Sequence, residues 1–122
     1  MDLQQAMAQR VFVVVGDTLN PEKYAYIIKH RLLAQGYTVY CVGKELASIN
    51  DVPEEIDVID LCINRYKGIR LLKECTKSFK TMIIQPGAES DEILRHLDEN
   101  KLPYMEACIL VGLSLYKRQP KV

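Results

Sequence analysis

The sequence predicts a three-layer α/β fold, in which an open parallel sheet of five strands lies between helices on both faces. Apolar, strand-like runs alternate five times with segments of helical periodicity. Each connection between successive strands is too long for a hairpin, which favours parallel pairing through crossovers. The first strand-like run, VFVVV at 11–15, is apolar at every position, as expected of a strand buried on both faces.

The first helix is predicted over residues 21–35. Asn20 is a good N-cap residue, and Pro21 suits the first helical position, where its missing N–H breaks no hydrogen bond. Gly36, just after the last helical residue, is expected to end this helix. The apolar residues at helical spacing should form the buried stripe, namely Ala25, Ile28 and Leu32, broadened by Tyr24 and Leu33.

The later elements follow in the same alternation. Strands are expected at 37–43, 56–63, 81–87 and 103–107, and helices at 66–77, 91–100 and 108–118. Ser90 should cap the helix at 91–100. Asp57 and Asp60 make the third strand more polar than the first, so we expect it near an edge of the sheet. No linker or internal repeat divides residues 1–122, which predicts a single domain with a core of about 10–116.

Composition and charge argue against several classes of protein. The 16 basic and 16 acidic residues cancel, whereas a nucleic-acid binder usually carries an excess of Lys and Arg. The four cysteines lack zinc-ligand spacing, so no metal site is predicted. No apolar run approaches the roughly 18 residues of a membrane span, and the N-terminus lacks a signal-peptide core. We therefore expect a cytoplasmic protein without a membrane partner.

Two turns are candidates for a ligand site. A strand order of 3-2-1-4-5 would place the ligand crevice between the first and fourth strands, with Gly16-Asp17-Thr18 beside Gln85-Pro86-Gly87. Gly16 permits unusual backbone conformations, Thr18 offers a hydroxyl, and the start of the following helix presents free N–H groups to an anion. From these residues alone, a phosphate site and an ordinary βα turn stay equally open, because GDT lacks the full G-x-G-x-x-G pattern.

Four longer segments carry a more specific pattern: VVVGDTLNPEKYAYIIKHRLLAQGYTVYCV, INDVPEEIDVIDLCI, IIQPGAES and PYMEACILV. In order and spacing they resemble the small stand-alone coenzyme A-binding proteins, whose Rossmann-like fold also forms the nucleotide-binding domain of the succinyl-CoA synthetase α subunit. The resemblance covers roughly residues 10–116. It implies binding of coenzyme A or an acyl-CoA, with the diphosphate over the first βα turn and the adenosine end near the loop after the second strand.

The resemblance also implies which residues contact the cofactor. They follow the carboxyl ends of the five predicted strands and are Gly16, Asp17, Thr18, Val42, Gly43, Lys44, Asn64, Arg65, Gln85, Gly87 and Cys108. Lys44 and Arg65 are expected to pair with phosphates. Other basic residues lie on one face of the helix at 66–77 and are expected to form a solvated surface, namely Lys67, Arg70, Lys73 and Lys77.

No catalytic residues are predicted. Two interpretations of Cys108 stay open, a reactive thiol at a helix N-terminus and a buried structural cysteine. His30 and His96 are expected to face solvent and have no Ser or Cys partner for nucleophilic catalysis. The phosphate-accepting receiver domains are disfavoured, because their acidic cluster around magnesium would need more than the single acid, Asp17, at the end of the first strand.

The main functional hypothesis is a non-catalytic carrier, sensor or regulatory protein for coenzyme A or an acyl-CoA. One alternative is a nucleotide-binding fragment or partner of a CoA-ligase or acyl-transfer enzyme. Another is a Rossmann-like scaffold that has kept the fold and lost the ligand. A second copy of the chain and a partner enzyme are the candidate macromolecular partners.

Overall fold

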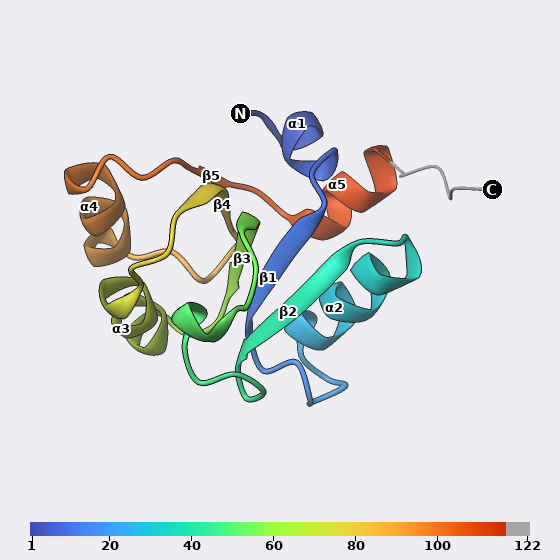
Figure 1. Cartoon of the computed structure of the whole chain (residues 1–122), viewed down its shortest axis with the longest axis horizontal. Coiled ribbons are helices and arrows are strands. Elements are labelled where there is room, and N and C mark those ends of the chain that lie inside the picture. The colour runs from blue at the N-terminus through green and yellow to red at the C-terminus, as the bar shows by residue number, and fades with distance from the viewer. Residues whose placement is uncertain (117–122) are drawn as a thin grey trace.

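The computed structural model describes residues 1–116 and confirms the three-layer α/β prediction (Figure 1). Its five strands form one parallel sheet: β1 (Val11–Gly16), β2 (Thr38–Gly43), β3 (Ile56–Cys62), β4 (Phe79–Ile84) and β5 (Tyr104–Glu106). The helices are α1 (Leu3–Met7), α2 (Tyr24–Ala34), α3 (Arg65–Glu74), α4 (Asp91–Glu99) and α5 (Ile109–Leu115), with a short 3-10 helix η1 (Ile49–Asp51). No helix within residues 1–116 is long and apolar enough to cross a bilayer.

Two apolar cores lie on opposite faces of the sheet. One packs beneath α3, α4 and η1 and the other beneath α1, α2 and α5. Because successive side chains of a strand point to opposite faces, β1 contributes Val13 and Val15 to the first core and Phe12 and Val14 to the second. This double burial explains why the run at 11–15 is apolar throughout.

The predicted strand order of 3-2-1-4-5 is wrong, since the observed order is β2-β1-β3-β4-β5. β3 therefore lies in the middle of the sheet, paired with both β1 and β4, and not near an edge. The prediction failed because it took the two aspartates of this strand as a sign of solvent contact. The connection from β2 to β3 crosses β1 on the face opposite α2, so the winding reverses between β1 and β3, and a ligand crevice is expected there.

The helix predicted over 21–35 begins three residues later, at Tyr24. The residues before it form a turn, in which Asn20 Oδ1 accepts the N–H of Glu22 at 3.0 Å and the Asn20 carbonyl accepts the N–H of Lys23 at 3.0 Å. Its buried stripe is limited to Ala25, Ile28 and Leu32, whereas Tyr24 and Leu33 are exposed.

The other predicted elements agree with the structure to within a few residues, with two differences. The fourth strand begins at Phe79 and ends at Ile84, so that Gln85-Pro86-Gly87 forms the following turn. Helix α1, which the sequence analysis did not predict, is capped by Asp2 and buries Ala6 and Met7. Ser90 caps α4 as predicted. The last two residues of the helix predicted at 108–118 lie outside the described residues.

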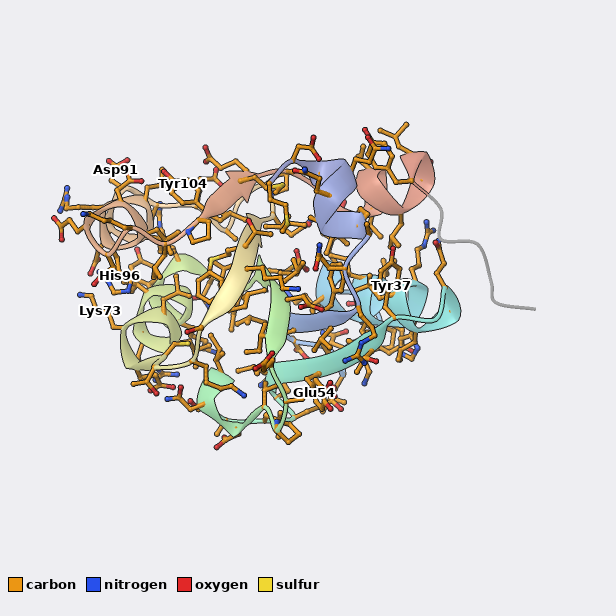
Figure 2. All side chains as sticks on the ribbon, turned by 45° about the horizontal axis from the view of Figure 1, so that its top comes forward. Tyr37, Glu54, Lys73, Asp91, His96 and Tyr104 are labelled. Carbon is orange, nitrogen blue, oxygen red and sulfur yellow. The ribbon has the colours of Figure 1, made fainter. Side chains whose placement is uncertain are left out.

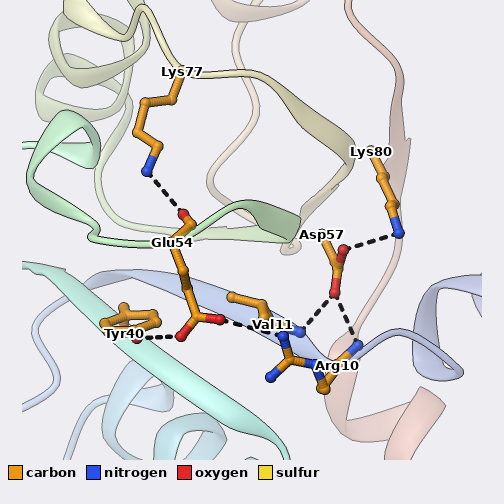
Figure 3. Close-up of polar contacts among 7 residues, drawn as sticks. All are labelled: Arg10, Val11, Tyr40, Glu54, Asp57, Lys77 and Lys80. Atoms are coloured by element: carbon orange, nitrogen blue, oxygen red, sulfur yellow. Dashed lines mark hydrogen bonds and ion pairs between the residues drawn. The ribbon is translucent and has the colours of Figure 1, made fainter.

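The pKa values of the two aspartates on β3 are shifted in opposite directions. Burial alone would raise the pKa of Asp57, but the N–H groups of Val11 and Arg10 and the Lys80 ammonium, 3.0 Å away, hold it below its usual value (Figure 3). Asp60 is fully buried, its register partners Val14 and Ile83 belong to the apolar core under α2 and α5, and neither carboxyl oxygen has a hydrogen-bond partner among the described residues. Burial therefore raises the pKa of Asp60 well above its usual value.

We predict opposite pH dependences for Asp57→Asn and Asp60→Asn. A raised pKa in the folded state means that this state binds more protons than the unfolded chain, so the stability of the wild type relative to Asp60→Asn falls as the pH rises above about 4. The lowered pKa of Asp57 has the reverse effect, and the wild type loses its advantage over Asp57→Asn, about 1–2 kcal/mol at neutral pH, as the pH falls below about 4.

The measurement is urea unfolding of the three proteins between about pH 3 and pH 8. Difference curves that slope in the same direction for both variants would contradict these assignments.

Candidate functional site

A pocket of about 520 Å³ lies at the carboxyl ends of β1 to β4. The turns after β1, β3 and β4 contribute Asp17, Asn64 and Pro86 to it, and the loop after β2 contributes Lys44. The loops after β1 and β2 project together from the lower side of the molecule in Figure 1. The two turns predicted to share a crevice thus line one pocket, although β3 lies between their strands.

The structure brings together most, but not all, of the residues singled out from the sequence. Those that line the pocket are Gly16, Asp17, Gly43, Lys44, Asn64, Gln85 and Gly87. Those outside its lining are Thr18, Val42, Arg65 and Cys108. His30 is exposed, His96 is half-buried, and neither lines the pocket.

The end of β1 is packed too closely for any side chain. A Cβ added at Gly16 would lie 2.4 Å from the Cys62 carbonyl oxygen of β3 and 2.7 Å from Ala25 Cβ of α2. Gly43, the register partner of Gly16 on β2, has a φ of +127°, and a Cβ there would lie 2.9 Å from the Gly16 carbonyl oxygen. Two glycines therefore leave main-chain atoms, and no side chains, at this point of the pocket wall.

The Thr18 hydroxyl, expected to face a phosphate, is turned into the protein. Thr18 is only 1% exposed, and its Oγ1 donates to Glu45 Oε2 at 2.6 Å, an oxygen that also accepts from Lys29 Nζ at 2.9 Å. These bonds, from Thr18 and then Lys29, hold the pKa of Glu45 below its usual value. They tie the loop after β1 to the loop after β2 and to α2, which holds Lys44 at the pocket.

The carboxylate of Asp17 also makes its hydrogen bonds within the protein, to the turn that follows it. Its Oδ1 accepts the N–H groups of Leu19 and Asn20, each at 3.2 Å. This local arrangement, which is typical of aspartate in turns, uses the carboxylate to shape the loop between β1 and α2.

Gln85 lines the pocket but uses its amide to hold α5. Gln85 Oε1 accepts the N–H of Ile109 at 2.7 Å, and its Nε2 donates to Cys108 Sγ at 3.4 Å. Cys108 is the N-cap residue of α5, and its side chain caps no backbone N–H. Gln85 therefore links the turn after β4 to the start of the last helix.

In the described part of the chain, four cationic side chains line the pocket, namely Lys23, Lys44, Lys67 and Arg70, against one carboxylate, Asp17. Within residues 1–116 none of the four has an ion pair or a side-chain hydrogen bond, whereas Lys29, Lys73 and Lys80 each pair with a carboxylate. The pocket is therefore electropositive and suited to an anionic ligand.

The sequence analysis missed three of these cations and one aromatic residue. Lys67 and Arg70 were assigned to a solvated helix face, and Lys23 and Tyr24 were assigned no contact with a ligand. The available signal was the spacing of Lys67, Arg70 and Leu71, which places them on one side of α3 next to the core. It did not reveal that this side borders the pocket.

The parallel sheet, the helices on both faces and the pocket at the carboxyl ends of the strands define an open, Rossmann-like α/β protein. A family model described as a CoA binding domain matches residues 10–114. The chain belongs to this CoA-binding domain family, which confirms the resemblance inferred from its sequence.

Solved structures share the fold. A conserved hypothetical protein from Pyrococcus furiosus is 31% identical, with a TM-score of 0.72 over 84% of this chain and 98% of its own. Prb, the PH1109 protein redesigned for binding, is 20% identical, with a TM-score of 0.76 over 97% and 92%. Cell-free ID.343 from Thermus thermophilus is 19% identical, with a TM-score of 0.72 over 93% and 98%. No curated protein matches the chain.

We predict that Gly16→Ala destabilises the protein by about 1–3 kcal/mol, because the new methyl group would overlap main-chain atoms of β3. Gly68→Ala is the matched control. Gly68 lies inside α3, where an added Cβ would have no contact closer than 3.5 Å, so this change should be neutral or stabilise by up to about 1 kcal/mol. Chemical unfolding measures both, and a Gly16→Ala variant as stable as the wild type would refute the close packing of β1.

Proposed function

We propose that this chain binds coenzyme A or an acyl-CoA in the pocket and acts as a non-catalytic, cytoplasmic carrier, sensor or regulatory protein. The observation that carries the proposal is a set of four cations, without ion-pair partners among the described residues, around a glycine-lined pocket in a member of the CoA-binding domain family. Coenzyme A carries a diphosphate and a 3′-phosphate, so it supplies the negative charge that these side chains lack.

The start of α2 fits a phosphate group. Lys23, its N-cap residue, makes no side-chain hydrogen bond to the first turn, which leaves N–H groups of that turn without a side-chain partner. Gly16 and Lys23 line the same pocket. Free N–H groups, the positive end of the helix dipole and a lysine together favour an anion at this wall. Lys44 adds a further cation from the loop after β2.

The chemistry of the pocket supports binding without catalysis. The one thiol in its lining belongs to Cys62, and burial above all, with Asp60 and Cys108 nearby, raises the pKa of this thiol to about 12. It is therefore protonated at neutral pH, and the reactive species of cysteine is the thiolate. Among the described residues, no histidine or serine lies in the lining to act as a base or nucleophile.

Tyr24 is suited to stack on the adenine base. Its side chain lines the pocket at the first residue of α2 and is 68% exposed, so the ring is available to a flat partner. Stacking of a base on an aromatic ring contributes about 1–3 kcal/mol. The neighbouring Lys23 would then lie close to the phosphates of the same nucleotide.

A ligand panel tests the proposed function. In thermal unfolding, coenzyme A and acetyl-CoA should stabilise the protein, by about 2.7 kcal/mol at a ligand concentration of 100 times Kd, and should do so more than NAD or ATP at equal concentration. Calorimetry of the same ligands gives the affinities. The absence of a shift with every nucleotide would contradict the proposal and favour a scaffold without a ligand. Binding only in the presence of a ligase or acyl-transfer partner would favour that alternative.

Tyr24→Ala should weaken coenzyme A binding by about 1–3 kcal/mol, roughly 5- to 150-fold, and Tyr24→Phe should not. The matched control is Tyr66→Ala. Tyr66 is 76% exposed near the start of α3, but it lies outside the lining of the pocket and packs under the Arg65 guanidinium at 5.5 Å. Calorimetry with coenzyme A and with 4′-phosphopantetheine, which has no base, measures the effect. Equal losses for both ligands would show that Tyr24 does not contact adenine.

A further inference from the structure

We propose that Lys67 and Arg70 of α3 form a second anion subsite, which binds an oxyanion of the ligand other than its diphosphate. This inference rests on the proposed function, because it assigns a further group of the same ligand to the same pocket. It also makes α3 a determinant of which coenzyme A derivative the protein prefers.

The pocket has two walls on opposite faces of the sheet. Helix α2, with Lys23 at its start, covers one face, and α3 covers the other (Figure 1). A diphosphate at Gly16 and the start of α2 is bound from the first wall. Lys67 and Arg70 approach the pocket from the second wall, so they meet a different part of a ligand that fills it.

The second wall is held in place by the fold. Lys67 and Arg70 are three residues apart and therefore lie on the same side of α3. Leu71, which also lines the pocket, is buried in the core beneath α3 and α4. Asn64 Oδ1 accepts the N–H of Lys67 at 3.0 Å and caps the helix. The two cations thus extend from a fixed backbone.

The charge of this wall is not neutralised by the protein. Neither Lys67 nor Arg70 has a carboxylate partner within residues 1–116, whereas Lys73 of the same helix pairs with Glu92 at 3.1 Å. Figure 2 shows Lys73 at the outer margin of α3. The carboxylate of Asp17, on the other wall, accepts N–H groups of its own turn.

A ligand that covers Lys67 and Arg70 must bring an anion to them. Both side chains are exposed in the free protein, and a bound ligand would remove them from water. Removing a charge from water without giving it a partner is strongly unfavourable, whereas Arg and Lys bind phosphate or carboxylate oxygens through strong charge-assisted hydrogen bonds. An acyl-CoA can supply such an oxyanion from its 3′-phosphate or from a carboxylate on its acyl group.

Calorimetry on the wild type, the double variant Lys67→Ala/Arg70→Ala and the control Lys73→Ala tests the subsite. The ligands are coenzyme A, 3′-dephospho-CoA, propionyl-CoA and succinyl-CoA. Thermal unfolding without ligand checks that the variants fold, as expected for changes at exposed side chains. Lys73→Ala removes one positive charge from the same helix outside the pocket and should bind every ligand as the wild type does.

If the 3′-phosphate occupies the subsite, the double variant should bind coenzyme A about tenfold or more weakly and 3′-dephospho-CoA with unchanged affinity. If an acyl carboxylate occupies it, the wild type should bind succinyl-CoA more tightly than propionyl-CoA, and the double variant should lose this preference. Either result supports the subsite.

Unchanged affinity of the double variant for all four ligands would overturn the inference and leave the proposed function standing. An equal loss for all four would also overturn it, since the cations would then bind the diphosphate. No binding of any ligand by the wild type would remove both proposals.

Discussion

The contact that the rest of the structure depends on is the close approach of main chains at the end of β1. Gly16 lies between Gly43 of β2 and Cys62 of β3, with Ala25 of α2 against it. β1 can therefore pair with both neighbours up to its last residue, and α2 can begin close to the sheet. The wall of the pocket at this point is then made of peptide groups. A side chain here would overlap the Cys62 carbonyl and Ala25, and so would push apart the elements that support the pocket.

The surroundings of this contact divide into residues that shape the pocket and residues that face it. Thr18, Glu45 and Lys29 join two loops and a helix, and Gln85 joins the turn after β4 to α5. Thr18 and Gln85 match the family pattern in the sequence, yet their hydrogen bonds are made within the protein. Among the described residues of the pocket lining, the polar side chains without a partner inside the protein are mainly the cations. The family motif therefore accounts for the framework of the site more directly than for its contacts with a ligand.

The charges at the site are mostly positive. Its open side carries four cations, whereas the strand beneath it carries Asp60, whose raised pKa favours the neutral form, and Cys62, whose thiol is protonated at neutral pH. A fully charged Asp60 in this core would oppose folding, since no described residue donates a hydrogen bond to it. Keeping the acid neutral removes a negative charge that would weaken the attraction of the pocket for an anion.

The sequence was sufficient to predict the layers and the alternation of elements, because both follow from local periodicity. It was insufficient for the strand order, because the direction of the crossover from β2 to β3 is not encoded in periodicity. Asp57 misled the prediction because its partners, Arg10 and Val11, lie 46 or 47 residues away in the chain. The hydroxyl of Thr18 was expected to face a phosphate, but it donates to Glu45, which lies 27 residues away in the chain.

The least predictable part of the site is the wall formed by α3. Helical periodicity separates the buried side of α3 from its polar side, but it does not say whether the polar side meets bulk water or a pocket. That distinction depends on the path of the chain from β2 to β3, which brings Ala47 and Lys44 toward the same pocket as Lys67. On an isolated helix, the spacing of Lys67 and Arg70 would not show what these cations face. The topology of the sheet places them at the pocket. In this protein the strand order, more than the turn motif, determines which cations line the pocket.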